Sequence, residues 1–415
     1  MELFVESTDK TPLSIGGKTP CTAQVIVDDE GVKCLPDALE RILPLGHVAL
    51  CFDDSVKDIG EVAADVVRRA GYSTECAALD KLATLREDAR LLISIGGGGA
   101  ANAVKLEASK RGVEWVHLMT CASTDSALYP YAELFADGRR KVVPCTPPSA
   151  VVIDEGALKT SPKRCTAAGY GTLFSKLMTL FSLRADAMSE GVHLPAEEAL
   201  AECLNSYFSE SSAEHPAVRT ARTLVKTGLI AECVPVDFLQ REEYHAALAL
   251  SAYRRRERLI GEDAMLATIA IASIYGAYFA HAPSDLFVPC GYCEDLRMLD
   301  KLCGLDMLTS ILDFKRGDKC ARKLFVAREY RNEWAALLSD TFGPLAARAR
   351  AFRRLYGDAG FWLGGYVSPD ALIGLTALSA ATLEDDSLLR ALKQSGLLDA
   401  AKLKAPLERL HRETA

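Results

Sequence analysis

Residues 93–105 read ISIGGGGAANAVK, and the type and spacing of these residues suit a phosphate-binding turn. The apolar residues 91–95 predict a buried strand, and residues 100–107 predict a helix that begins after the four glycines at 96–99. A strand, a glycine turn and a helix together present bare backbone N–H groups and a helix N-terminus, both of which bind phosphate. The same pattern also forms plain tight turns, and it lacks the G-x-G-x-x-G order, so both interpretations remain open.

The composition is that of an acidic globular protein. The chain has 415 residues, of which 49% are hydrophobic and 25% charged, and its formal net charge is −8. This length suffices for two domains, and the negative charge argues against a nucleic-acid partner. No apolar run reaches the ~18 residues that span a bilayer. The first ten residues lack the basic and apolar regions of a secretory signal, so we expect a cytoplasmic protein with no membrane partner.

Cysteine is frequent but follows no disulfide framework. The chain has 13 cysteines, an odd number that suits a reducing compartment. Cys290 and Cys293 form a single C-x-x-C pair without a second one, which is weak evidence for zinc. Ordinary free thiols are the favoured interpretation.

The first part of the chain alternates predicted strands with helices. We predict strands over residues 48–52, 91–95, 115–119 and 150–153, a helix over 56–70, and a hairpin with an Asp-Gly turn within 130–154. Strands that alternate with helices form a parallel sheet covered by helices on both faces.

After about residue 158 the pattern becomes helical. Helices are predicted over residues 167–184, 196–208, 217–229, 242–258 and 263–280, the last of them small and apolar enough to be buried. We therefore predict an α/β protein with a Rossmann-like nucleotide-binding domain over residues 1–158 and an all-helical domain over 159–415. An interdomain cleft is a common place for a ligand.

Several segments in this order resemble one superfamily. They are the glycine turn GGGAANAVK, TCASTDSALYP, DGRRKVVPCTPPSAVVIDEGAL, SPKRCTAAGYGTLFSKL, GEDAMLATIAIAS and ATLEDDSLLRALKQSGLL. The superfamily contains the iron-containing alcohol dehydrogenases, glycerol dehydrogenases and dehydroquinate synthases, and the chain is most similar to its glycerol-1-phosphate dehydrogenase branch. Lys105 matches the family's glycine-turn motif, whereas Asn102 stands where the family has Asp. The resemblance implies a dehydroquinate synthase-like fold and a dehydrogenase that uses NAD or NADP.

The resemblance also implies roles for individual residues. The glycine turn (Gly97, Gly98, Gly99) would hold the cofactor pyrophosphate, Thr120 and Ser123 would lie beside the cofactor, Asp53 would bind the adenosine ribose, and Asp125 would face the substrate hydroxyls. An acid at residue 53 would repel a 2′-phosphate and so favours NAD slightly over NADP. Without the resemblance, Asp125 would be interpreted as a cap or turn residue.

The metal-binding pattern of the family is broken here. Its enzymes hold a divalent metal such as zinc, iron or nickel through one Asp and two His, and this metal polarises the alcohol oxygen. The matching positions carry Thr172, His245 and Ile260. Isoleucine cannot bind a metal, and a threonine hydroxyl is a poor substitute for a carboxylate. We predict that the usual site is lost, with ligands from a shifted register, such as Glu262 or Cys165, as the alternative.

Two basic features have both a structural and a functional interpretation. His245 is either an ordinary helix histidine or a metal-free general base near the cofactor. The run of Arg254, Arg255, Arg256 and Arg258 is either a solvated helix end or a clamp for an anionic substrate.

Three hypotheses follow for the function. The first is an NAD(P)-dependent oxidoreductase of a small polyol or polyol phosphate, with Asp125 and His245 as its catalytic residues. The second is a catalytically inactive relative that binds the nucleotide without turnover. The third is a dehydroquinate synthase-like lyase, against which the same lost ligands count. A homo-oligomer is compatible with all three.

Overall fold

The computed structural model describes residues 2–3, 14–136, 139–191, 194–209, 213–234, 242–254, 259–281, 319–356, 368–380, 383 and 387–394. The chain divides into two compact units. The first contains residues 1–134, 141–169 and 198–236, and the second contains 135–140, 170–197 and 237–415. The predicted domain boundary at residue 158 remains a prediction.

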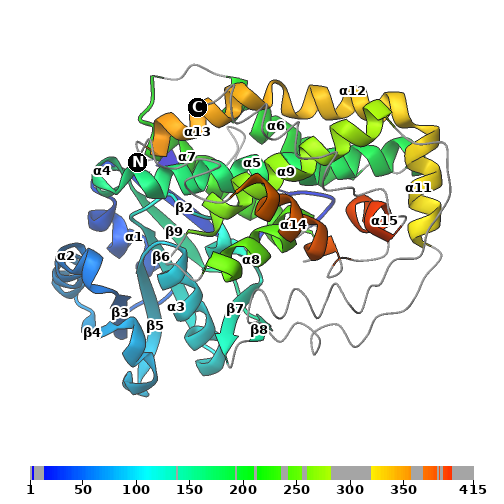
Figure 1. Ribbon diagram of the computed structural model, residues 1–415. Coiled ribbons are helices and arrows are strands. Elements are labelled where there is room, and N and C mark those ends of the chain that lie inside the picture. The colour runs from blue at the N-terminus through cyan, green and yellow to red at the C-terminus, as the bar shows by residue number, and fades with distance from the viewer. Residues whose placement is uncertain are drawn as a thin grey trace. The chain divides into compact units, whose positions relative to one another are not determined.

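A seven-stranded sheet forms the centre of the first unit. Its strands are β1 (Glu2–Leu3), β2 (Gln24–Asp28), β3 (His47–Phe52), β4 (Ser73–Ala78), β5 (Ala89–Gly96), β6 (Glu114–Met119) and β9 (Ala150–Asp154). Their spatial order is β1-β2-β9-β6-β5-β3-β4, and every pairing is parallel except that of the edge strand β1 (Figure 1). The predicted Rossmann-like α/β fold is confirmed.

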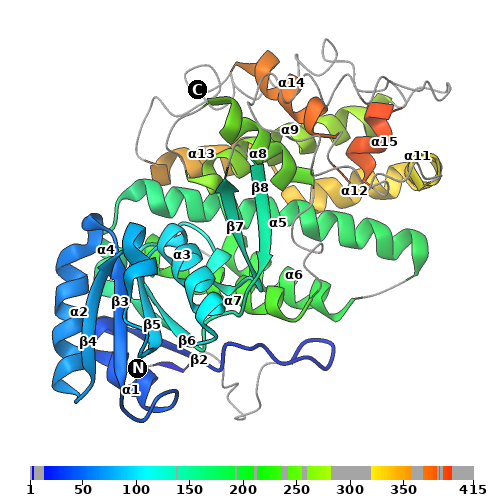
Figure 2. The same cartoon turned by 90° about the horizontal axis from the view of Figure 1, so that it is seen from below.

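Helices cover both faces of this sheet because its central strands are apolar on both sides. Helices α1 (Leu35–Glu40) and α2 (Lys57–Arg69) pack on one face, where Leu50 and Ile93 are fully buried (Figures 1 and 2). Helix α3 (Gly98–Arg111) packs on the opposite face against Trp115 and other buried side chains. Strands with two buried faces read as continuous apolar runs, which explains why β3, β5, β6 and β9 were predictable.

Three strands of the sheet were not predicted. The edge strand β1 has only two residues, too few to form a pattern, and the buried strand β2 (QVIVD) has only three consecutive apolar residues. Strand β4 (STECAA) is a largely exposed edge strand with few apolar residues, so its sequence carries little strand signal. The predicted hairpin corresponds to β7 (Tyr131–Ala136) and β8 (Arg139–Pro144), which form a separate two-stranded sheet; its Asp-Gly turn lies outside the described residues.

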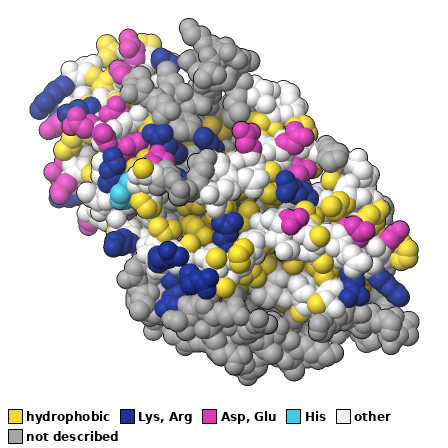
Figure 3. All heavy atoms as spheres, turned by 90° about the horizontal axis from the view of Figure 1, so that it is seen from above, with side chains coloured by type: hydrophobic (Ala, Val, Ile, Leu, Met, Phe, Trp, Pro, Cys, Tyr) yellow, Lys and Arg dark blue, Asp and Glu magenta, His cyan; other side chains and the backbone are white. Residues whose placement is uncertain are grey.

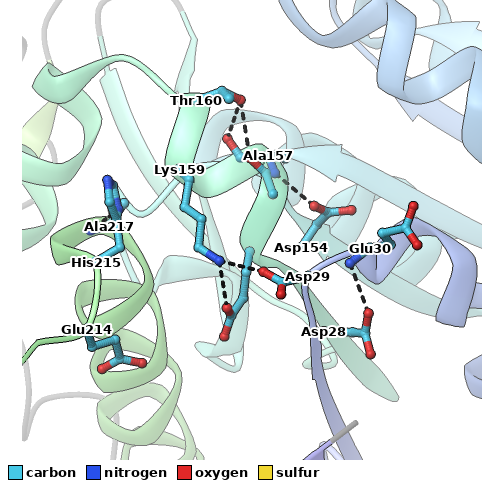
Figure 4. Close-up of polar contacts among 12 residues, drawn as sticks. Asp28, Asp29, Glu30, Asp154, Ala157, Lys159, Thr160, Glu214, His215 and Ala217 are labelled. Carbon is cyan, nitrogen blue, oxygen red and sulfur yellow. Dashed lines mark hydrogen bonds and ion pairs between the residues drawn. The ribbon is translucent and has the colours of Figure 1, made fainter.

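Acidic residues fasten the loops at the carboxyl ends of β2 and β9 (Figure 4). Asp154 ends β9 and caps α4 (Glu155–Thr160) by accepting a hydrogen bond from the Ala157 N–H at 2.8 Å, and its other oxygen accepts from Val32 N–H at 2.9 Å. Lys159 on α4 pairs with Asp29 at 2.5 Å. The carboxyl ends of these two strands, β2 and β9, are therefore closed by hydrogen bonds and an ion pair.

The remaining helices are α5 (Lys163–Glu190), α6 (Pro195–Ser209), α7 (Pro216–Glu232), α8 (Glu242–Arg254), α9 (Ile260–His281), α11 (Lys319–Glu329), α12 (Arg331–Phe342), α13 (Leu345–Tyr356), α14 (Pro369–Ser379) and α15 (Leu388–Gln394). Helix α7 belongs to the first unit. In the second unit, α8 and α12 pack along α9, and an aromatic cluster that includes Phe181, Tyr275, Phe279 and Trp334 fills the core. All five predicted helices of this part are present, and the predicted end of the fourth, residues 255–258, lies outside the described residues.

From the sequence we expected no apolar segment long enough to span a bilayer, and helix α9 corrects this expectation. Over residues 260–280 it is long and apolar enough to cross a membrane by length and composition, and 72% of its most apolar stretch is buried inside the structure. On the face shown in Figure 3, basic and acidic side chains of the described residues are intermixed.

Candidate functional site

Three adjacent strands place the glycine turn and its predicted partners at one edge of the sheet. Strand β5 lies between β3 and β6, and all three run parallel. The carbonyl of Gly96 accepts a hydrogen bond from Thr120 N–H at 3.1 Å, which joins the segments after β5 and β6. Gly96 has φ +137°, a conformation that favours glycine. The carboxyl edge of a parallel sheet is the usual ligand site of this architecture.

The turn leads directly into an uncapped helix. Gly97 is the N-cap of α3, no side chain caps this N-terminus, and the first turn contains no acidic residue. A Cβ added at Gly99 would meet nothing within 4 Å. Free space over an uncapped helix start with a positive dipole end is suited to a phosphate.

The neighbouring glycines are required by packing. A Cβ at Gly97 would lie 2.5 Å from the Sγ of Cys121, and one at Gly98 would collide with the side chain of Thr124. These two glycines therefore let the segment after β6 approach the turn, whereas the space beside Gly99 is not filled by the described residues. The prediction that Gly97 and Gly98 contact a cofactor remains a prediction.

Thr120 contributes a buried hydroxyl with no internal partner. Its side chain is 3% exposed, and its Oγ1 makes no hydrogen bond within the described residues. An unsatisfied buried hydroxyl costs free energy, so such a group is a candidate for a ligand contact. Ser123, 6% exposed, lies three residues further along the same segment. Thr120, Ser123 and the uncapped start of α3 thus fit a dinucleotide phosphate group.

Asp125 is buried, and side chains from two helices hold its carboxylate and the turn that follows it. Thr227 on α7 lies with its Oγ1 3.1 Å from Asp125 Oδ2. The fully buried Lys105 of α3 donates to the carbonyls of Ser126 at 2.6 Å and Tyr129 at 3.1 Å, and so fixes the short 3-10 turn that follows Asp125. Asp125 itself does not cap this turn through its side chain. Asp125 thus begins this turn through its backbone carbonyl, which accepts a hydrogen bond from Leu128 N–H at 3.0 Å.

Asp53 follows β3 at the same edge of the sheet. Cys51 pairs with Ser94 in the parallel register, so Asp53 is level with Gly96. Its exposed carboxylate accepts from Ser55 N–H at 2.8 Å and from the Ser55 hydroxyl. Asp53 thus fixes the turn that follows β3, and its carboxylate is exposed to solvent. The prediction that it binds the adenosine ribose remains a prediction.

The predicted metal positions lie in the helical unit. Gly171 packs so closely against the carbonyl of Gly261 that an added Cβ would collide with it. This contact places the neighbouring Thr172 and Ile260 near the crossing of α5 and α9, and the half-buried His245 lies on α8, which packs on α9. The triad itself remains a prediction.

These residues do not form a metal-ligand set, because isoleucine has no donor atom. Within the described ranges no group of three or more His, Cys, Asp or Glu side chains is arranged to hold a metal ion. Glu262, considered as a replacement ligand, is fully buried in the first turn of α9. The side chains of the arginine run 254–258 and the pair Cys290 and Cys293 lie outside the described residues.

Sequence reasoning gave no role to Thr227 or Cys121. Thr227 lies 102 residues from its partner Asp125, in an ordinary helical stretch, so no local signal marks it. Cys121 lies inside a quoted motif, but only the structure reveals its contact with the glycine turn.

Residues 30–162 match the family model described as iron-containing alcohol dehydrogenase. The chain is related to the iron-containing alcohol dehydrogenases. This match contains the glycine turn, Thr120, Ser123 and Asp125, and it confirms the resemblance found in the sequence.

Similar proteins support the same relationship. Glycerol-1-phosphate dehydrogenase [NAD(P)+] from Thermococcus kodakarensis is 25% identical over 257 residues, which cover 57% of this chain and 73% of that protein. The enzyme of the same name from Methanospirillum hungatei is 27% identical over 186 residues, which cover 41% of this chain and 52% of that protein.

Solved structures share the fold across nearly the whole chain. A probable glycerol dehydrogenase from Sinorhizobium meliloti has a TM-score of 0.55 and 15% identity, with 94% of this chain and 96% of that one covered. Maleylacetate reductase from a Rhizobium species has a TM-score of 0.54 and 13% identity, with 97% and 99% covered. At these sequence identities the structural similarity establishes the fold of the chain and does not establish its activity or substrate.

Proposed function

We propose that this protein is an NAD(P)-dependent oxidoreductase of a small polyol or polyol phosphate. The observation that carries the proposal is the uncapped N-terminus of α3 with open space over Gly99, next to the unsatisfied hydroxyl of Thr120. The named relatives support the substrate class, because they are glycerol-1-phosphate dehydrogenases.

The first unit would bind the dinucleotide. The N–H groups at the start of α3 would hold the pyrophosphate, Thr120 and Ser123 would orient the cofactor, and Asp53 would accept hydrogen bonds from the adenosine ribose. The exposed carboxylate of Asp53 would repel a 2′-phosphate, so we propose a modest preference for NAD.

The substrate alcohol would be oriented by Asp125. Its carboxylate, 1% exposed and fixed by Thr227, would accept a hydrogen bond from a substrate hydroxyl with little reorganisation. When bound, a nicotinamide cofactor would supply the hydride acceptor for the alcohol carbon. The hydroxyl proton must leave as this carbon becomes a carbonyl, and we propose the imidazole of His245 as the base that accepts it.

The protein would work without the metal ligands usual in its family, because Thr172 and Ile260 replace two of them. One imidazole is too few, since catalytic zinc sites usually take three protein ligands. The same observation favours the second hypothesis, a relative that binds the nucleotide without turnover.

Titration with NADH and NADPH, followed by the nicotinamide fluorescence, tests the binding step. Turnover is then assayed with dihydroxyacetone phosphate and with both enantiomers of glycerol phosphate, before and after addition of Zn²⁺, Ni²⁺ or Fe²⁺. We expect binding with turnover that does not require added metal. Binding without turnover under any condition would support the non-catalytic hypothesis, and absence of binding would contradict both.

A further inference from the structure

The thiol of Cys121 lies directly on the glycine turn. A Cβ at Gly97 would be 2.5 Å from Cys121 Sγ, so sulfur and turn backbone are already in contact. The Cys121 thiol also lies 3.8 Å from Ser123 Oγ. The residue is half-buried, which leaves part of it accessible to small reagents.

A second thiol lies beside it, on the first turn of α5. Gly169 of α5 packs on the segment after β6, where an added Cβ would collide with the carbonyl oxygen of Ala122. Cys165 precedes Gly169 by four residues and so shares its helix face. The Cys165 thiol forms a hydrogen bond with Cys121, which lowers the pKa of the Cys121 thiol; its bond with Ser123 acts in the same direction. Cys165 is also half-buried.

The environment of Cys121 differs from that of other cysteines. Burial raises the pKa of Cys51 to about 12 and that of Cys233 to about 11. Burial also raises the pKa values of Cys21, Cys34 and Cys76. Because the thiolate is the reactive form, the contact with the glycine turn and the hydrogen bonds of the thiol select the same cysteine.

We propose that Cys121 and Cys165 form a reversible dithiol–disulfide site that controls access of the nucleotide to the glycine turn. The effect on the nucleotide rests on the function proposed above, whereas formation of the disulfide does not. With a peroxide as oxidant, the Cys121 thiolate attacks the O–O bond and becomes a sulfenic acid. The Cys165 thiol then displaces hydroxide from that sulfur, so two thiols and one peroxide give one disulfide and two waters.

The disulfide would act on the turn through direct contact. Formation of the disulfide would pull Cys121 Sγ toward α5 and move the backbone after β6. This backbone is connected to the glycine turn, because Thr120 N–H donates a hydrogen bond to the carbonyl of Gly96. Since Gly97 touches Cys121, the start of α3 must adjust as well. Reduction by a thiol restores the open site.

Peptide mapping after treatment with hydrogen peroxide tests the site. Trypsin yields the peptides 112–139 and 165–176, each with a single cysteine. We expect these two peptides to become linked, with a mass lower by about 2 Da than their sum. The oxidised protein should bind NADH about tenfold more weakly than the reduced one, and dithiothreitol should restore binding.

Variants separate the two claims. Cys121→Ser and Cys165→Ser should each abolish the linked peptide and the loss of NADH binding, whereas Cys145→Ser, at a half-buried cysteine elsewhere, should show both. A reduced protein that binds NADH but never yields the linked peptide overturns this inference alone. A linked peptide with unchanged NADH affinity overturns the control of access. A reduced protein that fails to bind NADH instead contradicts the proposed function.

Discussion

The hydroxyl of Thr227 on α7 reaches Asp125 at the sheet edge, 3.1 Å away and 102 residues earlier in the chain. The same oxygen is 3.0 Å from the carbonyl of Leu224, so one proton serves two acceptors. Both side chains are almost fully buried. Beside them, Gly228 packs against Leu128 so closely that a Cβ would collide with it. Helix α7 therefore fixes the position of the carboxylate that we place at the substrate.

Removing this hydroxyl should impair substrate use but leave cofactor binding unchanged. Thr227→Val keeps the shape and removes this one hydroxyl donor to Asp125, so we expect kcat/KM for the polyol to fall about tenfold. Thr227→Ser retains the hydroxyl and serves as the control. A steady-state assay with a parallel NADH titration checks both variants. An equal loss of NADH affinity in Thr227→Val would contradict the role given to Asp125.

The glycine turn offers a contrast between two adjacent positions. Gly99→Ala fills space that no atom of the described residues occupies, so the free energy of unfolding should be unchanged or rise by about 0.5–1 kcal/mol. Its NADH affinity should fall about tenfold, because the new methyl group enters the predicted phosphate position.

Gly98→Ala should behave in the opposite way. Its methyl group collides with Thr124, so urea unfolding should show a loss of about 1–3 kcal/mol. If Gly99→Ala binds NADH as tightly as the wild type, the phosphate lies elsewhere.

Restoring the family's ligands should create a metal site. Thr172 and Ile260 are neighbours of the closely packed Gly171 and Gly261, so the double variant Thr172→Asp with Ile260→His would supply the two absent ligands alongside His245. We expect about one equivalent of bound Zn²⁺ by elemental analysis. Thr172→Asn with Ile260→His is the matched control, since it removes only the charge of the carboxylate. One equivalent of metal in the purified wild type would show that other ligands hold it.

Stability should depend on pH through Glu232 at the end of α7. Its carboxylate accepts hydrogen bonds from Thr22 N–H at 2.9 Å and from the Thr22 hydroxyl at 2.6 Å. Burial nevertheless raises the pKa of Glu232 to about 7 from an ordinary value of 4.5. Because the folded state holds this proton more tightly, its stabilising contribution is complete below pH 4.5 and is lost as the pH rises through 7.

Glu232→Gln removes this titration while keeping a side chain of similar shape. The difference in unfolding free energy between wild type and variant should change by about 1–3 kcal/mol from pH 4.5 to pH 8, with the wild type losing relative stability. Burial lowers the pKa of His117 to about 4, so the contribution of His117 to stability changes with pH in the opposite direction. Because wild type and variant both contain His117, this contribution cancels in the difference between their unfolding free energies. If the unfolding free energies of the two proteins changed equally with pH, the assignment of this pH dependence to Glu232 would be contradicted.

The sequence by itself determined the central strands, the glycine turn and the relationship to one enzyme family. Strands β3, β5, β6 and β9 are buried on both faces, so their residues form continuous apolar runs that are visible without the fold. The turn at Gly96 is equally local, because only glycine readily takes its positive φ. The prediction that Thr172 and Ile260 stand at metal-ligand positions likewise rests on residue type and order alone.

Tertiary structure decided which of these residues are brought together. It separated Gly99, with open space above it, from Gly97 and Gly98, which are glycine because other segments press against them. It also brought Thr227 to Asp125 and Cys165 to Cys121. Such contacts join helices to strand ends far away in the chain, and their side chains are of ordinary type for a helix or loop. Only packing selects the partner, so no periodicity or spacing in the sequence can reveal it.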